Sequence, residues 1–332
     1  MRITFFSAKP YDRETFNRLN ESFGFELIYF ETHLGPHIIN AVDQTDAVCA
    51  FVNDKLNAEV LNELALKGVK VVAMRCAGFN NVDLEVAKRL GIRICRVPAY
   101  SPEAVAEHAV AMLLTLNRKT HKAYNRVREQ NFSLNGLLGF NVHGKTVGVL
   151  GTGNIGTSFC KIMLGFGCRV VAFDLMPNPE LSKLGVTYLP KEEVFKCADI
   201  LSLHCPLNES THHIINREAI ALMKKGVMLV NTSRGGLIDT KAAIDALKSK
   251  QIGYLGLDVY EHEGQLFFRD LSANIIEDDT IQRLMSFPNV LITAHQAFLT
   301  EEALRQIAVT TLKSVHELLH GESLSVKSAL VV

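Results

Sequence analysis

The sequence predicts an α/β protein with two domains, each built on a parallel sheet. Short β-rich runs alternate with helix-like stretches along most of the chain, which is typical of strands joined by crossover helices. A polar stretch, VREQNFSLNG, interrupts this alternation before a second series begins. The length of 332 residues also exceeds the size at which a single core usually keeps growing. We therefore expect two separate cores.

The first series supplies five predicted strands: RITFF, LIYF, DAVCAFV, VKVVAMRC and IRICRVP. Amphipathic stretches such as NAEVLNELALKG between them predict helices. Pro98 ends the last strand, and Ser101-Pro102-Glu103 then supplies an N-cap, a proline for the first helical position and a first-turn acid. A long helix to about Arg118 should follow.

The second series supplies six predicted strands: KTVGVLG, CRVVAFD, ADILSLHCP, GVMLVNTS, GYLGLDVY and NVLITAH. Six strands are enough for a complete nucleotide-binding sheet. After the last of them, Thr300-Glu301-Glu302 predicts the start of a helix that runs to about His320.

Composition excludes several classes of partner. Lys+Arg and Asp+Glu number 35 each, so the chain lacks the basic excess that nucleic-acid binding requires. The N-terminus does not read as a signal peptide and no run reaches membrane-spanning length, so we expect a cytoplasmic protein without a membrane partner. The seven cysteines lack CxxC spacing and are expected to be reduced thiols. We expect no metal, because adjacent His212 and His213 should point in different directions on any regular element.

The glycine pattern G-x-G-x-x-G opens the second series in the context that dinucleotide binding requires, between a buried strand and a helix. Gly151 allows the tight turn, Gly153 lets the backbone approach a pyrophosphate, and Gly156 permits close helix packing. The helix that starts at Asn154 and Ile155 offers unpaired amides to the phosphates.

Asp174 ends the next strand, eighteen residues beyond Gly156. An acid at this place should hydrogen-bond the adenosine ribose hydroxyls and disfavour a 2′-phosphate, which favours NAD over NADP. The alternative is an ordinary βαβ turn with an incidental aspartate at the strand end.

Seven segments together carry a resemblance to a known family: RCAGFNNVD, VPAYSPEAVAEHAV, GTGNIG, SLHCPL, NTSRGGLID, LDVYEHE and TAHQAFLT. Over essentially its whole length the chain resembles the D-isomer-specific 2-hydroxyacid dehydrogenases, and within them the bacterial fermentative D-lactate dehydrogenases. The resemblance implies NAD-dependent reduction of pyruvate to D-lactate.

The resemblance also implies the architecture. Residues 101–298 should form a doubly wound Rossmann-type NAD domain, and residues 1–100 with 299–332 a discontinuous, flavodoxin-like substrate domain. The catalytic site should lie between them.

Three residues should carry the chemistry. Arg234 follows an apolar strand, and its planar fork can pair with the carboxylate and carbonyl of a keto acid. Without the surrounding motif, a surface ion pair would be the favoured interpretation of a lone arginine there. His295 follows the strand NVLITA and can protonate the nascent alkoxide. Glu263 matches the acid that hydrogen-bonds the histidine in this family.

Other positions follow from the resemblance. Ala77 and Gly78 match the turn whose amides hold the substrate carboxylate. Tyr100 and Phe298 should wall the methyl pocket, or else be ordinary core aromatics at a domain hinge. The residues expected near the nicotinamide ribose and carboxamide are Cys205, Pro206, Thr232, Ser233 and Asp258. His204 and Tyr260 are expected behind them.

Alternative functions remain open at this point. The substrate could be another 2-keto acid, such as phenylpyruvate, glyoxylate or hydroxypyruvate, or the chain could be a non-catalytic NAD-sensing corepressor. Formate dehydrogenases of the same superfamily are disfavoured, because they place a glutamine where Glu263 stands. The apolar face of AVAEHAVAMLLTL suggests more surface than one domain hides, so a homo-oligomer, a dimer or a tetramer, is expected.

Overall fold

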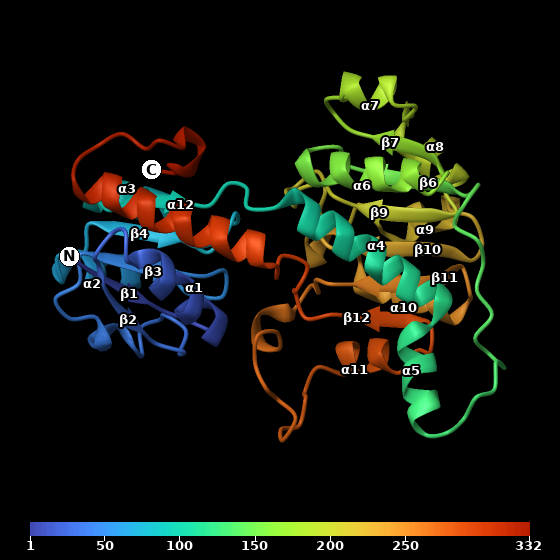
Figure 1. Ribbon diagram of the computed structural model, residues 1–332, viewed down its shortest axis with the longest axis horizontal. Coiled ribbons are helices and arrows are strands. Elements are labelled where there is room, and N and C mark those ends of the chain that lie inside the picture. Colours follow the sequence, from blue (N-terminus) through green and yellow to red (C-terminus); the bar gives the residue numbers. More distant parts are fainter. The chain divides into compact units, whose positions relative to one another are not determined.

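A computed structural model describes residues 1–332, except for the side chain of Gln265. The chain divides into two compact units, residues 1–101 with 299–332 and residues 102–298 (Figure 1). Among the described residues, no helix combines the length and apolar character needed to cross a membrane.

The first unit is built on a five-stranded parallel sheet in the order β2-β1-β3-β4-β5. This is the flavodoxin-like order, in which the strand sequence reverses beside β1. All five strands overlap the predicted segments: β1 (Arg2–Phe5), β2 (Glu26–Tyr29), β3 (Ala47–Ala50), β4 (Val71–Met74) and β5 (Arg93–Arg96). Strands β3 and β4 are buried along their whole length, as expected for parallel strands covered on both faces.

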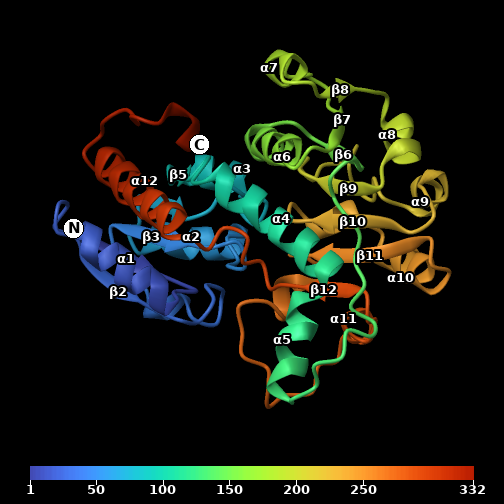
Figure 2. The same ribbon diagram turned by 45° about the vertical axis from the view of Figure 1, so that its right-hand side comes forward.

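Helices cover both faces of this sheet (Figure 2). The C-terminal helix returns to this unit and packs on β4, β5 and the first helix. Its start is capped by Thr300, whose side chain accepts from the amide of Ala303, as the sequence predicts. The helices are α1 (Pro10–Asn20), α2 (Ala58–Leu66), α3 (Leu84–Leu90) and α12 (Glu301–Leu319), with 3₁₀ turns η1 (Ile39–Ala41) and η4 (Lys327–Ala329).

The second unit is built on a seven-stranded parallel sheet in the order β12-β11-β10-β9-β6-β7-β8. This is the Rossmann order with one further strand, and the order reverses between β6 and β9. Its strands are β6 (Thr146–Leu150), β7 (Arg169–Phe173), β8 (Thr187–Tyr188), β9 (Ile200–Leu203), β10 (Val227–Asn231), β11 (Ile252–Leu257) and β12 (Val290–Ile292). Six of them were predicted. The seventh, β8, is a two-residue edge strand, too short to produce a recognisable apolar run.

Two hydrophobic cores, one built with α4 and α6 and the other with α8, α9 and α10, include residues from the strands of this sheet. Phe159 of α6 and Leu113 of α4 are fully buried in one core, and Val194 of α8 in the other. The helices are α4 (Pro102–Arg118), α5 (Thr120–Arg128), α6 (Asn154–Gly165), α7 (Pro179–Lys183), α8 (Lys191–Cys197), α9 (Arg217–Leu222), α10 (Thr240–Lys248) and α11 (Asp279–Met285), with 3₁₀ turns η2 (Gly235–Leu237) and η3 (Glu263–Gln265).

The prediction of an oligomer rested on an exposed apolar face of α4, and the structure does not show such a face. The apolar face of α4 packs on α6, β10, β11 and β12 within its own unit, so it is not surplus surface. Exposed apolar side chains lie instead on α5, which was not predicted, and on the segment after it: Tyr124, Val127, Phe132, Leu134 and Leu138.

Candidate active site

The predicted site residues of the second unit gather at one edge of its sheet. Because all seven strands run parallel, their carboxyl ends share an edge, where open α/β sheets bind ligands. The residues that follow these ends are Gly151 after β6, Asp174 after β7, Cys205 and Pro206 after β9, Thr232, Ser233 and Arg234 after β10, Asp258 after β11, and His295 after β12.

The glycine loop has the backbone that its sequence predicts. Gly151 has a φ of +90°, and a Cβ there would lie 2.7 Å from the amide nitrogen of Cys205, so only glycine fits. A Cβ on Gly156 would collide with the carbonyl oxygen of Gly151. Because glycine has no Cβ, helix α6 can approach the loop this closely. A Cβ on Gly153 meets nothing within 4 Å. The space beside Gly153 is therefore free for a ligand at the start of α6, where Asn154 and Ile155 begin the helix.

Asp174 is tied to this loop. Its Oδ2 accepts hydrogen bonds from the amide of Thr152 at 2.5 Å and from the Thr152 hydroxyl at 3.0 Å. Its Oδ1 accepts from the amide of Met176 at 2.9 Å. These bonds hold the carboxylate beside the glycine turn, the place a ribose-binding acid requires.

His204 supports the loop from behind. Its backbone amide donates to Leu150, its ring packs on Phe159, and burial lowers its pKa to about 3, so the imidazole is neutral at physiological pH. The neutral ring therefore packs with the apolar core that positions Gly151.

The loops after β9 and β10 are joined to each other. The hydroxyl of Ser233 donates to the carbonyl oxygen of Cys205 at 2.7 Å. The hydroxyl of Thr232 is buried and finds no partner among the described residues. The carbonyl oxygen of Pro206 accepts from Thr211 at 2.6 Å.

Arg234 is exposed, and its guanidinium is not engaged with any acid. Its Nη1 donates only to the carbonyl oxygen of Ser233, at 2.7 Å, and no carboxylate lies within ion-pair distance among the described residues. The alternative of a surface ion pair is therefore not what the structure shows. The next residue, Gly235, has to be a glycine, because a Cβ there would collide with the backbone of Tyr260 and Glu261. That close approach brings the Arg234 loop against the loop after β11.

His295 and Glu263 form a hydrogen-bonded pair. Nδ1 of His295 lies 2.8 Å from Oε1 of Glu263, and both side chains are about one-fifth exposed, at 20% each. Oε2 of Glu263 accepts from the amide of Tyr260 at 2.9 Å, so both oxygens are held. Since Nδ1 faces the carboxylate, Nε2 is the nitrogen left to exchange a proton with a substrate.

Asp258 organises the turn that carries His295. Its backbone oxygen accepts from the His295 amide at 2.7 Å, where His295 has the uncommon φ of +53°. Its carboxylate accepts from the Thr293 hydroxyl at 2.6 Å and from the amides of Gln296 and Ala297 at 2.9 and 3.0 Å. Nε2 of His108 lies 3.4 Å away. The sequence indicated a place near the nicotinamide for Asp258 but not this supporting role, and it did not single out His108 or Thr293.

Burial alone would raise the pKa of the Asp258 carboxyl. The hydrogen bonds from His108, Thr293 and the two backbone amides outweigh this effect and lower the pKa below its usual range. Asp258 is therefore a buried carboxylate at physiological pH, and its charge is satisfied inside the protein.

In the first unit, Ala77 and Gly78 follow the carboxyl end of β4. Nη1 of Arg96 donates to the carbonyl oxygen of Ala77 at 2.8 Å, and the Cys76 thiol donates to that of Gly78 at 3.2 Å. The amides of Ala77 and Gly78 donate to no acceptor among the described residues. The turn thus has fixed carbonyls and two amides available for an anion.

The two aromatic residues proposed for the methyl pocket belong to different units. Tyr100 lies near the end of the first segment of its unit and is partly exposed. Phe298 is the last residue of the second unit and is 8% exposed.

One expectation about the histidines is wrong. The rings of His212 and His213 stack, with centroids 3.9 Å apart, rather than pointing in different directions. The pair lies in a turn rather than on a helix or strand, and His213 has a φ of +51°, which brings adjacent side chains to the same side.

Comparison with known proteins gives the family. Residues 110–297 match the model of the D-isomer-specific 2-hydroxyacid dehydrogenase NAD-binding domain. The chain belongs to the D-isomer-specific 2-hydroxyacid dehydrogenases. It is 54% identical to 2-hydroxyacid dehydrogenase homolog 1 of Schizosaccharomyces pombe, over 96% of both chains. It is 52% identical to D-lactate dehydrogenase of Escherichia coli, over 97% of this chain and 98% of that protein.

Among solved structures, a pyruvate reductase of Chlamydomonas reinhardtii is 45% identical and covers 98% of both chains with a TM-score of 0.93. The second unit is thus the NAD-binding domain of a 2-hydroxyacid dehydrogenase. The free space at Gly153, the acid at Asp174 and the exposed N-terminus of α6 fit a dinucleotide.

Proposed function

We propose that this protein is an NAD-dependent D-lactate dehydrogenase that reversibly reduces pyruvate to D-lactate. The observation that carries the proposal is the His295–Glu263 pair, held at the same sheet edge as an exposed arginine without an acidic partner and a dinucleotide-binding glycine loop. The names of the Escherichia coli and Chlamydomonas reinhardtii proteins support lactate and pyruvate as the reactants.

Arg234 binds and polarises the keto acid in this proposal. A planar guanidinium can donate two parallel hydrogen bonds, which suits a carboxylate and the adjacent carbonyl oxygen. The carbonyl carbon becomes more electrophilic as its oxygen is drawn toward the positive charge.

His295 is the general acid in reduction and the general base in oxidation. Nε2 of the imidazolium donates a proton to the oxygen as the carbonyl becomes an alcohol, and it takes the proton back in the reverse direction. Glu263 stabilises the positive charge on the ring and fixes its tautomer through Nδ1. When bound, NADH supplies the hydride that reaches the carbonyl carbon.

We assign the cofactor to the loops at the carboxyl ends of the second sheet. Gly151, Gly153, Asn154, Ile155 and Gly156 would cradle the pyrophosphate, and Asp174 would bind the adenosine ribose. The nicotinamide half would be held by Cys205, Pro206, Thr232, Ser233 and Asp258. The unpartnered Thr232 hydroxyl supports this placement.

The remaining substrate contacts come from four further residues. The free amides of Ala77 and Gly78 are suited to bind the carboxylate of pyruvate. Tyr100 and Phe298 would line the methyl pocket, and bulky rings there would favour pyruvate over longer keto acids. On this basis, residues 1–100 with 299–332 act as the substrate domain and residues 101–298 as the cofactor domain.

We further propose that the enzyme is a cytoplasmic homo-oligomer that regenerates NAD in fermentation. Seven free cysteines, five of them buried, suit a reducing compartment. The exposed apolar side chains of α5 and the segment after it, rather than the face of α4, support association.

A panel of 2-keto acids with NADH and with NADPH, followed by chiral analysis of the product, tests the proposal. We expect pyruvate with NADH to give the highest kcat/KM and the product to be D-lactate. A higher kcat/KM for phenylpyruvate or hydroxypyruvate would assign a related dehydrogenase instead. NADH binding without turnover on any keto acid would favour a sensor.

A further inference from the structure

We propose that His212, His213 and Glu261 form a binding site for a transition-metal dication, best matched by Zn²⁺. The three residues each offer one ligand atom, and these atoms all lie within 4.8 Å of one another. None of the three belongs to the catalytic or cofactor-binding residues proposed above, so the site is independent of that proposal.

Two loops bring the ligands together. His212 and His213 lie in the turn after β9, which is anchored by a hydrogen bond of 2.8 Å from the amide of His213 to the carbonyl oxygen of Gly236. Glu261 lies in the loop after β11, which packs directly against Gly235. Both loops are therefore positioned by the same segment, residues 235–236, rather than by chance proximity of mobile side chains.

Two of the three ligand atoms already lie in contact. Nε2 of His213 lies 2.7 Å from Oε1 of Glu261, in a direct hydrogen bond. Two ligands of a tetrahedral zinc ion, with bonds of about 2.0–2.1 Å, lie about 3.3 Å apart. An ion would thus replace the shared proton if these two atoms separated by about 0.6 Å. The exposed His212 ring would also have to turn out of its stack with the His213 ring to aim a nitrogen at the ion.

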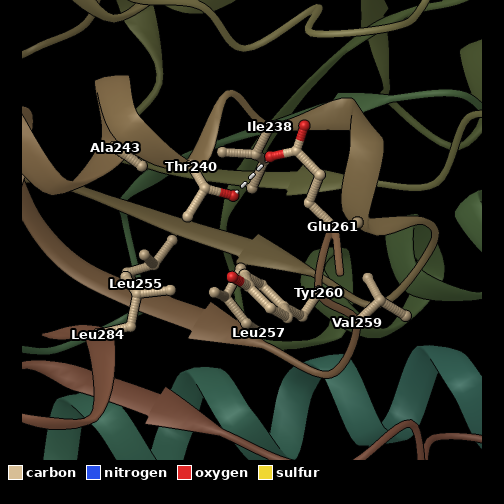
Figure 3. Close-up of a pocket in the computed structure, with 10 residues that line it drawn as sticks. Ile238, Thr240, Ala243, Leu255, Leu257, Val259, Tyr260, Glu261 and Leu284 are labelled. Atoms are coloured by element: carbon tan, nitrogen blue, oxygen red, sulfur yellow. Dashed lines mark hydrogen bonds between the residues drawn. The ribbon is translucent and has the colours of Figure 1, made fainter. Parts of the chain in front are cut away.

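A hydrogen bond from α10 holds the carboxylate of Glu261 in place. The hydroxyl of Thr240, the first residue of α10, donates to Oε2 of Glu261 at 2.9 Å (Figure 3). This bond leaves Oε1 facing the histidines and fixes the orientation of the carboxylate, as outer-shell partners do in metal sites.

The donor atoms and the size of the adjacent cavity indicate which kind of metal ion the site would take. A cavity of about 10 Å³ lies beside Thr240 and Glu261, lined mainly by apolar side chains, and it has room for no more than about one water molecule. An ion must therefore reach Glu261 from the exposed side of His212. Two imidazoles and one carboxylate suit Zn²⁺, Ni²⁺ or Cu²⁺, whereas Mg²⁺ and Ca²⁺ require oxygen ligands. Three protein ligands leave a fourth position for water.

Isothermal titration of the full chain with ZnCl₂, after treatment with a chelator, tests the proposal. We expect one Zn²⁺ per chain, a loss of affinity of at least about 10-fold in His212→Ala, and a loss of about 10–100-fold in Thr240→Val, the usual effect of removing an outer-shell partner. His212 is exposed, so its variant should fold normally. Zn²⁺ should also raise the Tm of the wild type but not that of His212→Ala.

His320→Ala is the matched control, because the rings of His316 and His320 form another close pair, with centroids 4.2 Å apart at the C-terminal end of α12. Its affinity for Zn²⁺ should equal that of the wild type. Substitution of Co²⁺ should give visible absorption without a thiolate-to-metal band, since no cysteine belongs to the site. The proposal is overturned by absence of stoichiometric binding, by wild-type affinity in His212→Ala, by loss of binding in His320→Ala, or by a thiolate band.

Discussion

Glu263 and His295 lie 32 residues apart in sequence and share a hydrogen bond of 2.8 Å between Oε1 and Nδ1. The carboxylate is itself held by the Tyr260 amide, so the ring is oriented by a group that cannot easily rotate away. This relationship fixes the orientation of the imidazole and leaves it one free nitrogen.

Glu263→Gln should therefore lower kcat for pyruvate reduction, because a neutral amide replaces the carboxylate that orients the ring for proton transfer. Initial rates at saturating pyruvate and NADH measure the loss. Asp245→Asn, at an exposed ion pair with Arg217, is the control and should leave kcat unchanged. A wild-type kcat in Glu263→Gln would show that the pair has no role in proton transfer.

Arg234→Lys should raise the KM for pyruvate and also slow turnover, because a point charge replaces a planar fork. Steady-state kinetics with pyruvate as the varied substrate separate the two effects. Arg217→Lys, at an exposed arginine paired with Asp245, is the matched control. If Arg234→Lys behaved like that control, Arg234 would have to be removed from the site.

Gly153→Ala and Gly156→Ala should fail in different ways. The added methyl group at Gly153 meets open space, so the protein should keep its Tm but bind NADH more weakly, by about 10-fold or more if the pyrophosphate needs that space. The methyl group at Gly156 collides with the Gly151 carbonyl and should lower the Tm. Thermal unfolding and NADH fluorescence titration distinguish the two. Normal NADH affinity in Gly153→Ala would place the cofactor elsewhere.

Asp258→Asn should destabilise the protein by about 3–5 kcal/mol, the usual cost of breaking a buried charged network. The side-chain amide of the asparagine would also turn its NH₂ group toward the backbone N–H of Gln296 or Ala297, where two donors would face each other without an acceptor. Denaturant unfolding at neutral pH measures the loss. A change below about 1 kcal/mol would mean that the turn at His295 is held by other contacts.

The Asp258 carboxylate should also make the free energy of unfolding depend on pH. Because its pKa is lower in the folded protein than the ordinary value of 3.8, its stabilising effect is complete above that value and is lost as the pH falls through the folded-state pKa. The free energy of unfolding should therefore fall more steeply below pH 4 in the wild type than in Asp258→Asn. Parallel acid limbs would contradict this assignment.

Most of the fold could be predicted from local pattern. The apolar runs predict eleven of the twelve strands, and the glycines at 151, 153 and 156 fall where backbone geometry and close packing require them. The strand β8 could not be predicted, because a two-residue edge strand has no periodicity. The helix α5 was missed because it is short and mostly polar, and its few apolar residues, such as Tyr124 and Val127, are exposed rather than part of a core.

Features that depend on distant segments were harder to predict. The sequence indicates Asp258 as a polar residue at a strand end, but its hydrogen bonds reach His108, far upstream, and the turn at Thr293–Ala297. Likewise, the stacking of His212 on His213 depends on a positive φ that a regular element would not have. The apolar face of α4 was assigned to an interface because the sheet that covers it is assembled from later strands.

The turnover number of His295→Ala with saturating pyruvate and NADH tests the central claim most directly. We predict a fall in kcat of about 10²–10⁴-fold, or about 3–5 kcal/mol, the usual contribution of a positioned general acid, with NADH affinity unchanged. His37→Ala, at an exposed histidine of the first unit, should turn over like the wild type. A kcat for His295→Ala within a few-fold of the wild type would contradict the account.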